Sequence, residues 1–261
     1  MKPTFIITSA INTNVGIYSP EARIMQTHAT IDSILREYPD AITVLVEGGK
    51  QIPEISPLGQ QMTVLKNRVN VNLSMVGNAQ MIHLHEQFFD KIQTKTEMGG
   101  TTGLSKTVGE LTLFASVLDA LKNNDQCGPI LESDRIFKIS GRYQLSPLFD
   151  KAIYESDLTK GKYVFRKRDP SWMGDAIEKI GVSYSYASRL WSFTPGQLDD
   201  CIEKFQEMIE NCVDVSMKSY VDIEHLLFKF YNNDTEGDDV YEVEHTHLMG
   251  TIAPNGVMVY D

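Results

Sequence analysis

Arg135-Ile136-Phe137-Lys138-Ile139-Ser140-Gly141-Arg142-Tyr143 is the stretch on which the fold of this chain depends. Its first half alternates strand-forming residues with basic ones, and this alternation predicts a β-strand. Gly141 then marks the point where the strand bends or where another group approaches the backbone. Ligands of parallel α/β sheets bind at the carboxyl ends of strands, so the Arg142 guanidinium would suit a phosphate or a carboxylate there. The alternative is a strand that ends in a solvated turn.

The N-terminal part of the chain predicts a parallel βαβ unit. Phe5-Ile6-Ile7 and residues 41–46 are short apolar runs of the kind that form fully buried strands. Between them, Ser19 and Pro20 are the residue types of a helix N-cap and a first helical position, and the helix is expected to stop before Pro39. A strand, a helix and a second strand within about fifty residues form a right-handed crossover.

The rest of the chain predicts further elements of one α/β domain. Helices are expected at 61–69, 79–93, 105–122, from 198 onwards and at 220–231, and strands at 71–76, 162–168, 182–187, 240–248 and 257–260. The spacing of Thr194 and Gln197 predicts a capping box before the helix that begins at 198. Because no repeat or linker interrupts the chain, residues 1–261 are expected to form a single α/β domain with a mixed, mostly parallel central sheet.

The composition excludes several classes of protein. The formal net charge of -11 is opposite to the basic surface that nucleic-acid binding needs. No apolar run approaches the ~18 residues of a membrane span, and the apolar stretch near Met1 is too short for a signal peptide. The three cysteines are scattered and lack a metal-ligand spacing, which indicates buried, reduced thiols. We therefore expect a cytoplasmic protein with no nucleic-acid partner and no transmembrane segment.

Two motifs match ligand sites only in part. Residues 99–107 have the glycines of a phosphate loop but no Gly-Lys-Ser/Thr triplet, so a P-loop is excluded. Lys106 still opens a predicted helix, whose N-terminus favours anions, and Glu110 belongs to the same first turn. His245 and His247 would share one face of a strand as weak candidates for metal ligands, although such histidines more often make ordinary hydrogen bonds.

Glu224 and His225 lie on a predicted helix whose other residues are mostly apolar. An ionised carboxylate in such surroundings is costly unless it is paired or faces a cavity. One interpretation is an internal ion pair with an arginine. The other is a carboxylate that lines a substrate pocket and acts as a base. The sequence leaves both open.

Several blocks of the chain, taken in order, resemble the GT-A type glycosyltransferases. They are Phe5-Ile6-Ile7-Thr8-Ser9-Ala10-Ile11-Asn12-Thr13, a helix with Arg23, a strand that ends in Glu47, Lys106-x-x-Gly109-Glu110, Phe137-Lys138-Ile139-Ser140-Gly141-Arg142-Tyr143 and Ile223-Glu224-His225. In combination they look like a bacterial and phage group with that fold. The blocks are spread over most of the chain, and the Ser-Gly-Arg-Tyr strand is the distinctive one among them.

The resemblance implies a nucleotide-binding half at residues 1–145 and an acceptor-side half at 146–261. The loop after the first strand would hold the nucleotide, and Glu47 would contact the base or the ribose. Catalysis would fall to Glu224 and Arg142. Residues expected to contact the nucleotide or substrate are Thr8, Ser9, Asn12, Arg23, Glu47, Lys106, Glu110, Lys138, Ser140, Gly141, Tyr143 and His225.

The activity implied by the resemblance is transfer of a sugar from a nucleoside-diphosphate donor to an unknown acceptor, a saccharide or another molecule. GT-A enzymes usually bind a divalent metal through Asp-x-Asp, and this chain contains no Asp-x-Asp. Arg142 with Lys138 or Lys106 would then neutralise the departing diphosphate, which leaves a requirement for manganese or magnesium in doubt.

Two other functions compete with the transferase hypothesis. One is a non-catalytic sugar- or nucleotide-binding protein on the same fold. The second is a nucleotidyltransferase, which is disfavoured because the chain has neither the glycine-rich signature loop nor the paired metal-binding acids of that class.

Overall fold

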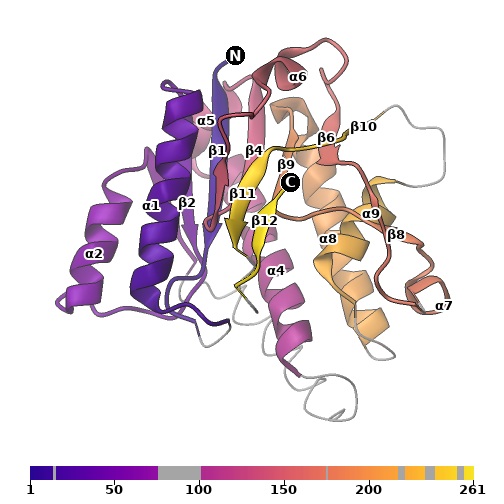
Figure 1. Cartoon of the computed structure of the whole chain (residues 1–261), viewed down its shortest axis with the longest axis horizontal. Coiled ribbons are helices and arrows are strands. Elements are labelled where there is room, and N and C mark those ends of the chain that lie inside the picture. Colours follow the sequence, from indigo (N-terminus) through magenta and orange to yellow (C-terminus); the bar gives the residue numbers. More distant parts are fainter. Residues whose placement is uncertain (14–15, 76–100, 175, 217–220, 233–238, 252–255) are drawn as a thin grey trace.

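The computed structural model describes residues 1–13, 16–75, 101–174, 176–216, 221–232, 239–251 and 256–261, apart from the side chains of 101–106, 126, 176, 179 and 213–216. Its centre is a seven-stranded sheet with the order β10-β6-β9-β4-β1-β2-β3 (Figure 1). The strands are β1 (Pro3–Ser9), β2 (Ile42–Glu47), β3 (Val71–Ser74), β4 (Arg135–Ser140), β6 (Tyr163–Arg166), β9 (Leu190–Phe193) and β10 (Val240–Val243). Neighbouring strands pair in parallel except at β9, which is antiparallel to both β4 and β6. The predicted single α/β domain with a mixed, mostly parallel sheet is confirmed.

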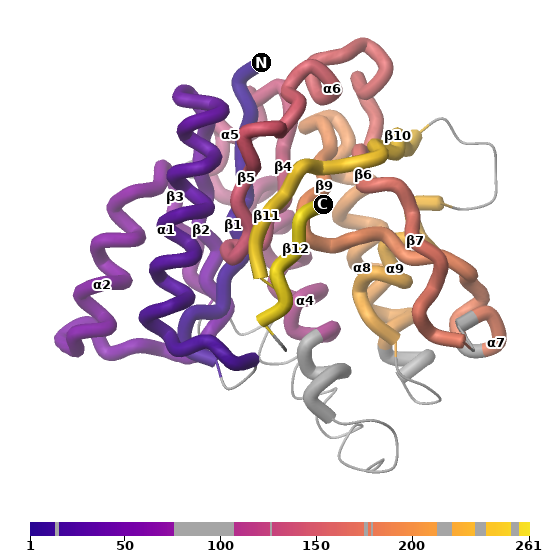
Figure 2. The backbone as a smooth tube through the Cα atoms, viewed as in Figure 1, coloured from indigo at the N-terminus to yellow at the C-terminus, as the bar shows by residue number. Residues whose placement is uncertain are grey.

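Helices cover both faces of this sheet (Figures 1 and 2). One face carries α1 (Pro20–Glu37) and α2 (Pro57–Lys66), and the other carries α4 (Thr101–Asn123), α8 (Leu198–Ser216) and α9 (Ile223–Tyr231). Side chains alternate along a strand, so Phe5 and Ile7 of β1 join the core under α1, while Ile6 joins the core under α4. The continuous apolar run of β1 is therefore explained by a helix layer on each side. Shorter helices are α5 (Gly128–Leu131), α6 (Lys151–Glu155) and α7 (Ala176–Ile180), with 3-10 turns at Asp125–Cys127 and Pro195–Gln197.

The chain leaves the central sheet at Gly141, as the sequence predicts. It continues as β5 (Tyr143–Leu145), which forms a second sheet with β11 (Leu248–Thr251) and β12 (Met258–Tyr260). Gly141 N donates to Thr8 O at 2.8 Å, and a Cβ at this position would lie 3.1 Å from Thr27 Oγ1. A side chain at this position would press against β1 and α1, so glycine allows the bend to lie this close to both. The third sheet pairs β7 (Asp169–Pro170) with β8 (Tyr184–Ser185).

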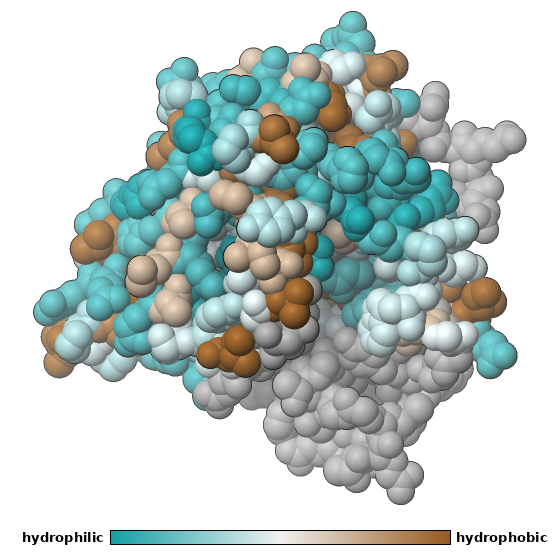
Figure 3. Space-filling model, in the orientation of Figure 1, coloured by the Kyte–Doolittle hydropathy of each residue, from teal (hydrophilic) through white to brown (hydrophobic). Residues whose placement is uncertain are grey.

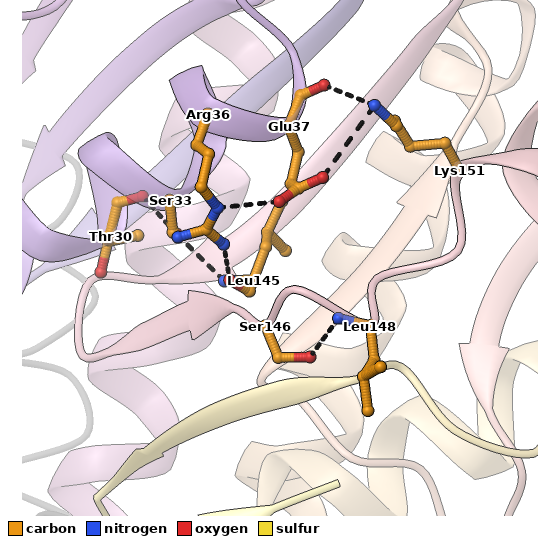
Figure 4. Close-up of polar contacts among 8 residues, drawn as sticks. All are labelled: Thr30, Ser33, Arg36, Glu37, Leu145, Ser146, Leu148 and Lys151. Carbon is orange, nitrogen blue, oxygen red and sulfur yellow. Dashed lines mark hydrogen bonds and ion pairs between the residues drawn. The ribbon is translucent and has the colours of Figure 1, made fainter.

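The second sheet is fixed to α1 by polar side chains (Figure 4). Ser33 Oγ accepts from Leu145 N at 3.0 Å, and Arg36 Nη2 donates to Leu145 O at 2.5 Å. Lys151 Nζ donates to Glu37 O at 2.9 Å. Both backbone polar groups of Leu145 therefore have a partner on α1, and the bend after β4 is held from two sides.

The two predicted ends of α1 agree with the structure, whereas the strand predicted at 240–248 does not. Ser19 Oγ accepts from Ala22 N at 3.2 Å as the N-cap of α1, and the helix ends at Glu37, before Pro39. The predicted strand at 240–248 is wrong, because β10 ends at Val243 and β11 begins at Leu248. His247 has a φ of 52°, which a strand does not accommodate, so His245 and His247 lie in a connection and not on one strand face.

One further difference concerns the strands between residues 182 and 193. The strand expected at 182–187 is reduced to β8, while β9, which the sequence analysis did not find, follows at Leu190–Phe193. The helix expected at 79–93 lies outside the described residues. Among the described helices, none combines the length and apolar character that crossing a membrane requires.

Candidate active site

Glu47 fixes the loops that follow β1 and β2. Its carboxylate accepts hydrogen bonds from Ile11 N at 2.9 Å, from Gly49 N at 2.7 Å and from the Ser9 hydroxyl. Burial raises the pKa of Glu47, and it outweighs these three bonds, which act in the opposite direction. Asn12 belongs to the same region, since its carbonyl accepts from Lys50 N at 2.7 Å. Glu47 therefore shapes the loop of the expected nucleotide contacts, and its own contact with a ribose stays a prediction.

Arg23 lies in the first turn of α1, within electrostatic reach of Arg142. Its Nη1 donates to Ala10 O at 3.3 Å, and its Nε donates to Tyr18 O at 3.3 Å. The pKa of Arg23 is lowered, first by burial and then by the positive charge of Arg142, while Glu47 opposes the shift. Two guanidiniums therefore repel each other at the carboxyl edge of the sheet.

Two arginines contact the ring of Tyr143, which is 2% exposed. The Cζ atom of Arg142 lies 5.7 Å from the ring centroid, and that of Arg189 lies 5.6 Å from it. Both distances are within the cation–π range. Arg142 Nε is buried and has no hydrogen-bond partner. In the described part of the chain, neither guanidinium forms an ion pair with a carboxylate.

Lys138 is a buried neighbour of this cluster and is fully bonded. Its Nζ donates to Glu110 Oε1 at 3.1 Å, to Ser140 Oγ at 3.1 Å and to Ser188 O at 2.7 Å. An ammonium group has three donors, and each has a partner inside the protein. The structure thus brings three expected site residues together, but Lys138 has no donor left for a phosphate.

Glu224 lies next to this network rather than in an ion pair with Arg142. Its Oε1 accepts from Ser188 Oγ at 2.7 Å, and its backbone carbonyl accepts from Tyr186 N at 3.0 Å. The residue is only half-buried. Ser188 therefore connects Lys138 with Glu224, and Arg189 follows directly in the sequence.

His225, the neighbour of Glu224, points to another part of the molecule. Its Nδ1 is bonded to Asp222 Oδ1 at 2.5 Å, and its Nε2 is bonded to Ser171 Oγ at 2.7 Å. The ring is completely buried. His225 thus connects the N-terminus of α9 with the segment that follows β7, and it is not exposed to a ligand.

Solved structures with a similar fold include sugar transferases. The galactosyltransferase LgtC, in complex with donor and acceptor sugar analogs, matches with a TM-score of 0.50 and 10% identity, over 93% of this chain and 73% of that chain. Mouse xyloside xylosyltransferase 1 matches with a TM-score of 0.48 and 9% identity, over 93% of this chain and 84% of that chain. Neither a family model nor a curated protein sequence matches the chain.

The fold is that of the GT-A glycosyltransferases. At these identities the likeness concerns the fold alone, and it agrees with the resemblance noted in the sequence. A divalent metal, if bound as the resemblance in the sequence implies, would lie at the carboxyl edge of β1, β2 and β4.

The side chains at this edge do not fit the metal that GT-A enzymes usually bind. β4 is followed by Gly141 and Arg142, and a guanidinium at this point repels a cation. Among the described residues, no group of three or more His, Cys, Asp or Glu side chains is placed to hold a metal ion. His245 and His247 have ring centroids 5.8 Å apart, and metal binding by this pair stays a prediction.

Sequence reasoning missed Arg189 and Ser188. Both precede β9, whose antiparallel direction brings its N-terminal end to the carboxyl edge of β4, where Ser140 N donates to Arg189 O at 3.0 Å. The run Leu190-Trp191-Ser192-Phe193 is the signal that could have found them, because it is rich in strand formers. Among the expected residues, the side chain of Lys106 lies outside the described part of the chain.

Proposed function

We propose that the protein transfers a sugar from a nucleoside-diphosphate donor and that arginines, rather than a metal ion, neutralise the diphosphate. The observation that supports this most directly is the pair of guanidiniums of Arg142 and Arg189 on the Tyr143 ring. They lie at the carboxyl edge, where ligands of open α/β sheets bind.

The electrostatics of the cluster favour a bound anion. Arg142 lowers the pKa of Arg23, which means that the apo protein holds these like charges together at a cost. The buried Nε of Arg142 adds an unsatisfied donor. A diphosphate would offset the repulsion and accept from the Arg142 guanidinium in a bidentate contact. Arg189 takes the role that the sequence analysis gave to Lys138, so the donor site draws on both halves of the chain.

In the proposed reaction, the bond between the anomeric carbon and the diphosphate oxygen breaks, and its electron pair leaves with the nucleoside diphosphate. The acceptor oxygen bonds to that carbon, and its proton passes to Glu224. Arg142 and Arg189 stabilise the charge that develops on the leaving group. Residues 146–261 would supply the acceptor side through Glu224.

One observation favours the non-catalytic alternative. Glu224 Oε1 already accepts from Ser188 Oγ at 2.7 Å, as a carboxylate with a structural role would. A protein that binds a sugar nucleotide without transferring its sugar would keep the arginine cluster and need no base.

Thermal unfolding with UDP-, GDP-, TDP- and CMP-sugars, each with manganese and with EDTA, tests the donor site. A ligand at a hundred times its Kd adds ~2.7 kcal/mol to the free energy of unfolding, an easily measured shift. We expect the three diphosphate classes to include a ligand that stabilises the protein in EDTA, and the monophosphate CMP-sugars to act less. Arg142→Ala should remove the shift. Arg68→Ala, which breaks an ion pair with the exposed Asp32, should keep it.

Release of free sugar from the stabilising nucleotide, without acceptor, then separates the enzyme from the binding protein. Slow hydrolysis that Glu224→Gln reduces supports a transferase. Absence of a thermal shift with every nucleotide would contradict the proposed donor site.

A further inference from the structure

Trp172 is an exposed aromatic side chain that the proposed reaction does not yet use. The chain has two tryptophans. Trp191 is 2% exposed within the core, whereas Trp172 is 68% exposed, in the segment that follows β7. A large aromatic ring in water loses the burial that usually holds it in place, so its orientation must come from other contacts.

The indole of Trp172 is held by a buried carboxylate. Its Nε1 donates to Asp222 Oδ2 at 3.2 Å, and Asp222 is only 7% exposed. Asp222 is itself fixed as the N-cap of α9, because its Oδ1 accepts from His225 N at 2.9 Å and contacts the His225 ring. The rings of Trp172 and His225 meet edge to face, with centroids 6.1 Å apart.

The backbone beside Trp172 is held by the same histidine. His225 Nε2 is bonded to Ser171 Oγ at 2.7 Å, and Ser171 Oγ accepts from Met173 N at 3.1 Å. Ser171 N also donates to Ser183 O at 2.8 Å. Buried polar groups thus fix both the indole and the chain that carries it, and they leave most of the ring exposed. Such preorganisation reduces the entropy lost when a ligand binds.

We propose that Trp172 is a stacking platform for the pyranose ring of a saccharide, which is the acceptor if the proposed transferase function holds. The face of an indole is electron-rich, and the C–H groups on one side of a pyranose present a weakly positive, apolar surface to it. Figure 3 shows a mainly hydrophilic surface over β6, the strand that precedes β7 in the chain, and such a surface suits the hydroxyl groups of a sugar better than an apolar protein partner.

The first turn of α9 connects this platform with the proposed base. Asp222 holds Trp172, and Glu224, two residues later, is bonded to Ser188 next to Arg189. Side chains two residues apart at the start of a helix point to different sides, so α9 links the platform to the proposed base through the chain and does not place the two side by side. The sequence analysis did not predict that His225 would contact Ser171, Trp172 and Asp222.

Tryptophan fluorescence tests the platform directly, because Trp191 is buried and acrylamide will quench mainly Trp172. The ligands are methyl β-glucopyranoside, methyl β-galactopyranoside, lactose and maltose. Sorbitol and galactitol serve as controls, since they have similar hydroxyl groups but no ring. We expect at least one pyranoside to halve the quenching constant at millimolar concentration and the alditols to leave it unchanged. Equal protection by the alditols, or no protection by any pyranoside, would overturn the proposal.

Calorimetric titration of variants with the protecting pyranoside assigns the binding to the ring. Trp172→Ala should weaken binding at least tenfold, while Trp172→Phe should retain most of it. Tyr260→Ala, which removes another exposed aromatic residue, should bind normally. Unchanged binding by Trp172→Ala would also overturn the proposal. The thermal shift with sugar nucleotides should not change in Trp172→Ala, so loss of the saccharide site and failure of the donor site are distinguishable.

Discussion

The two ends of β4 each present an arginine, and the two arginines have opposite surroundings. At the amino end, Arg135 is 2% exposed, and its Nη1 donates to Lys162 O at 3.2 Å and to Ser192 Oγ at 3.1 Å. Its Nη2 donates to Thr159 O. Beyond the carboxyl end, Arg142 has the Tyr143 ring beside it, and its guanidinium makes no hydrogen bond to a described residue. The Nε atom of each arginine is buried without a partner, so the difference lies in the Nη atoms.

This difference separates an arginine that holds the fold together from one whose donors remain available. Burial lowers the pKa of Arg135 to about 10, and the cost of burying the charge is offset by hydrogen bonds to two carbonyl groups and a hydroxyl group. Arg142 is half-buried, beside Arg23, and lacks such compensation. An arginine whose Nη atoms the protein does not satisfy is a candidate for contact with an anion.

Replacing Arg135 should have the largest effect on stability. Arg135→Ala removes a buried guanidinium and its hydrogen bonds to Lys162 O, Thr159 O and Ser192 Oγ, so we expect a loss on the order of 3 kcal/mol in the free energy of unfolding. Urea titration measures it. Arg142→Ala under the same conditions should change the stability by less than about 1 kcal/mol. Equal destabilisation by the two substitutions would mean that both arginines are structural.

Replacing Arg142 should have the largest effect on diphosphate binding. Charge-assisted hydrogen bonds contribute about 1.5–3 kcal/mol, so Arg142→Ala should weaken nucleoside-diphosphate binding by about 10- to 100-fold. Arg142→Lys should restore only part of this, because an ammonium cannot make the bidentate contact. Calorimetric titration in EDTA gives the affinities. A destabilised Arg142→Ala protein that binds the nucleotide normally would contradict the proposed role.

Glu224 extends the comparison to a carboxylate near the same edge. If it accepts the acceptor's proton, Glu224→Gln should lower turnover by ~10²-fold while donor affinity changes little. Ser188→Ala removes the hydrogen bond to Glu224 without removing the base, and it serves as the matched control. Steady-state rates and donor titrations should be measured on both variants. Unfolding of Glu224→Gln would instead identify a structural carboxylate.

Replacing Glu47 should have the smallest effect of these substitutions. The effect should be seen in how the free energy of unfolding depends on pH. Burial raises the pKa of folded Glu47 above its ordinary value of 4.5, so the folded state binds the proton more tightly than the unfolded chain does. The stabilisation is complete below pH 4.5 and is lost as the pH rises through the raised pKa. Glu47→Gln should flatten this part of the profile, as measured by urea titration from pH 4 upward. An identical profile in the variant would exclude Glu47 as its source.

The fold could be predicted where local patterns agree with tertiary packing. Phe5-Ile6-Ile7 and the Ser19 cap specify β1 and the start of α1 through apolar runs and capping chemistry, which are local properties. β9 is different. It has four residues, lies directly before the turn that starts at Thr194, and is defined by its pairing with β4 and β6. Pairing between distant segments leaves little trace in a local pattern.

The site follows the same division. The position of Arg142 could be predicted because it follows the end of a strand with a clear local pattern, whereas its role stays a prediction. Arg189 could not be predicted, since it reaches the Tyr143 ring through the β4–β9 register. Lys138 was expected to contact the diphosphate, but its three partners on other elements were not visible in the sequence. Trp172 was missed for a similar reason, because its indole partner Asp222 is distant in the sequence.

The reversed direction of β9 also sets the order in which the molecule can acquire its ligand. Arg142 is synthesised well before Arg189, and the two meet at Tyr143 when β9 pairs with β4. The N-terminal strands can form their βαβ unit during synthesis, but a nascent chain that ends before β9 carries half of the proposed anion site. Competence to bind a sugar nucleotide should therefore arise late on the ribosome, after residue 193 has emerged and the non-local pairing has closed.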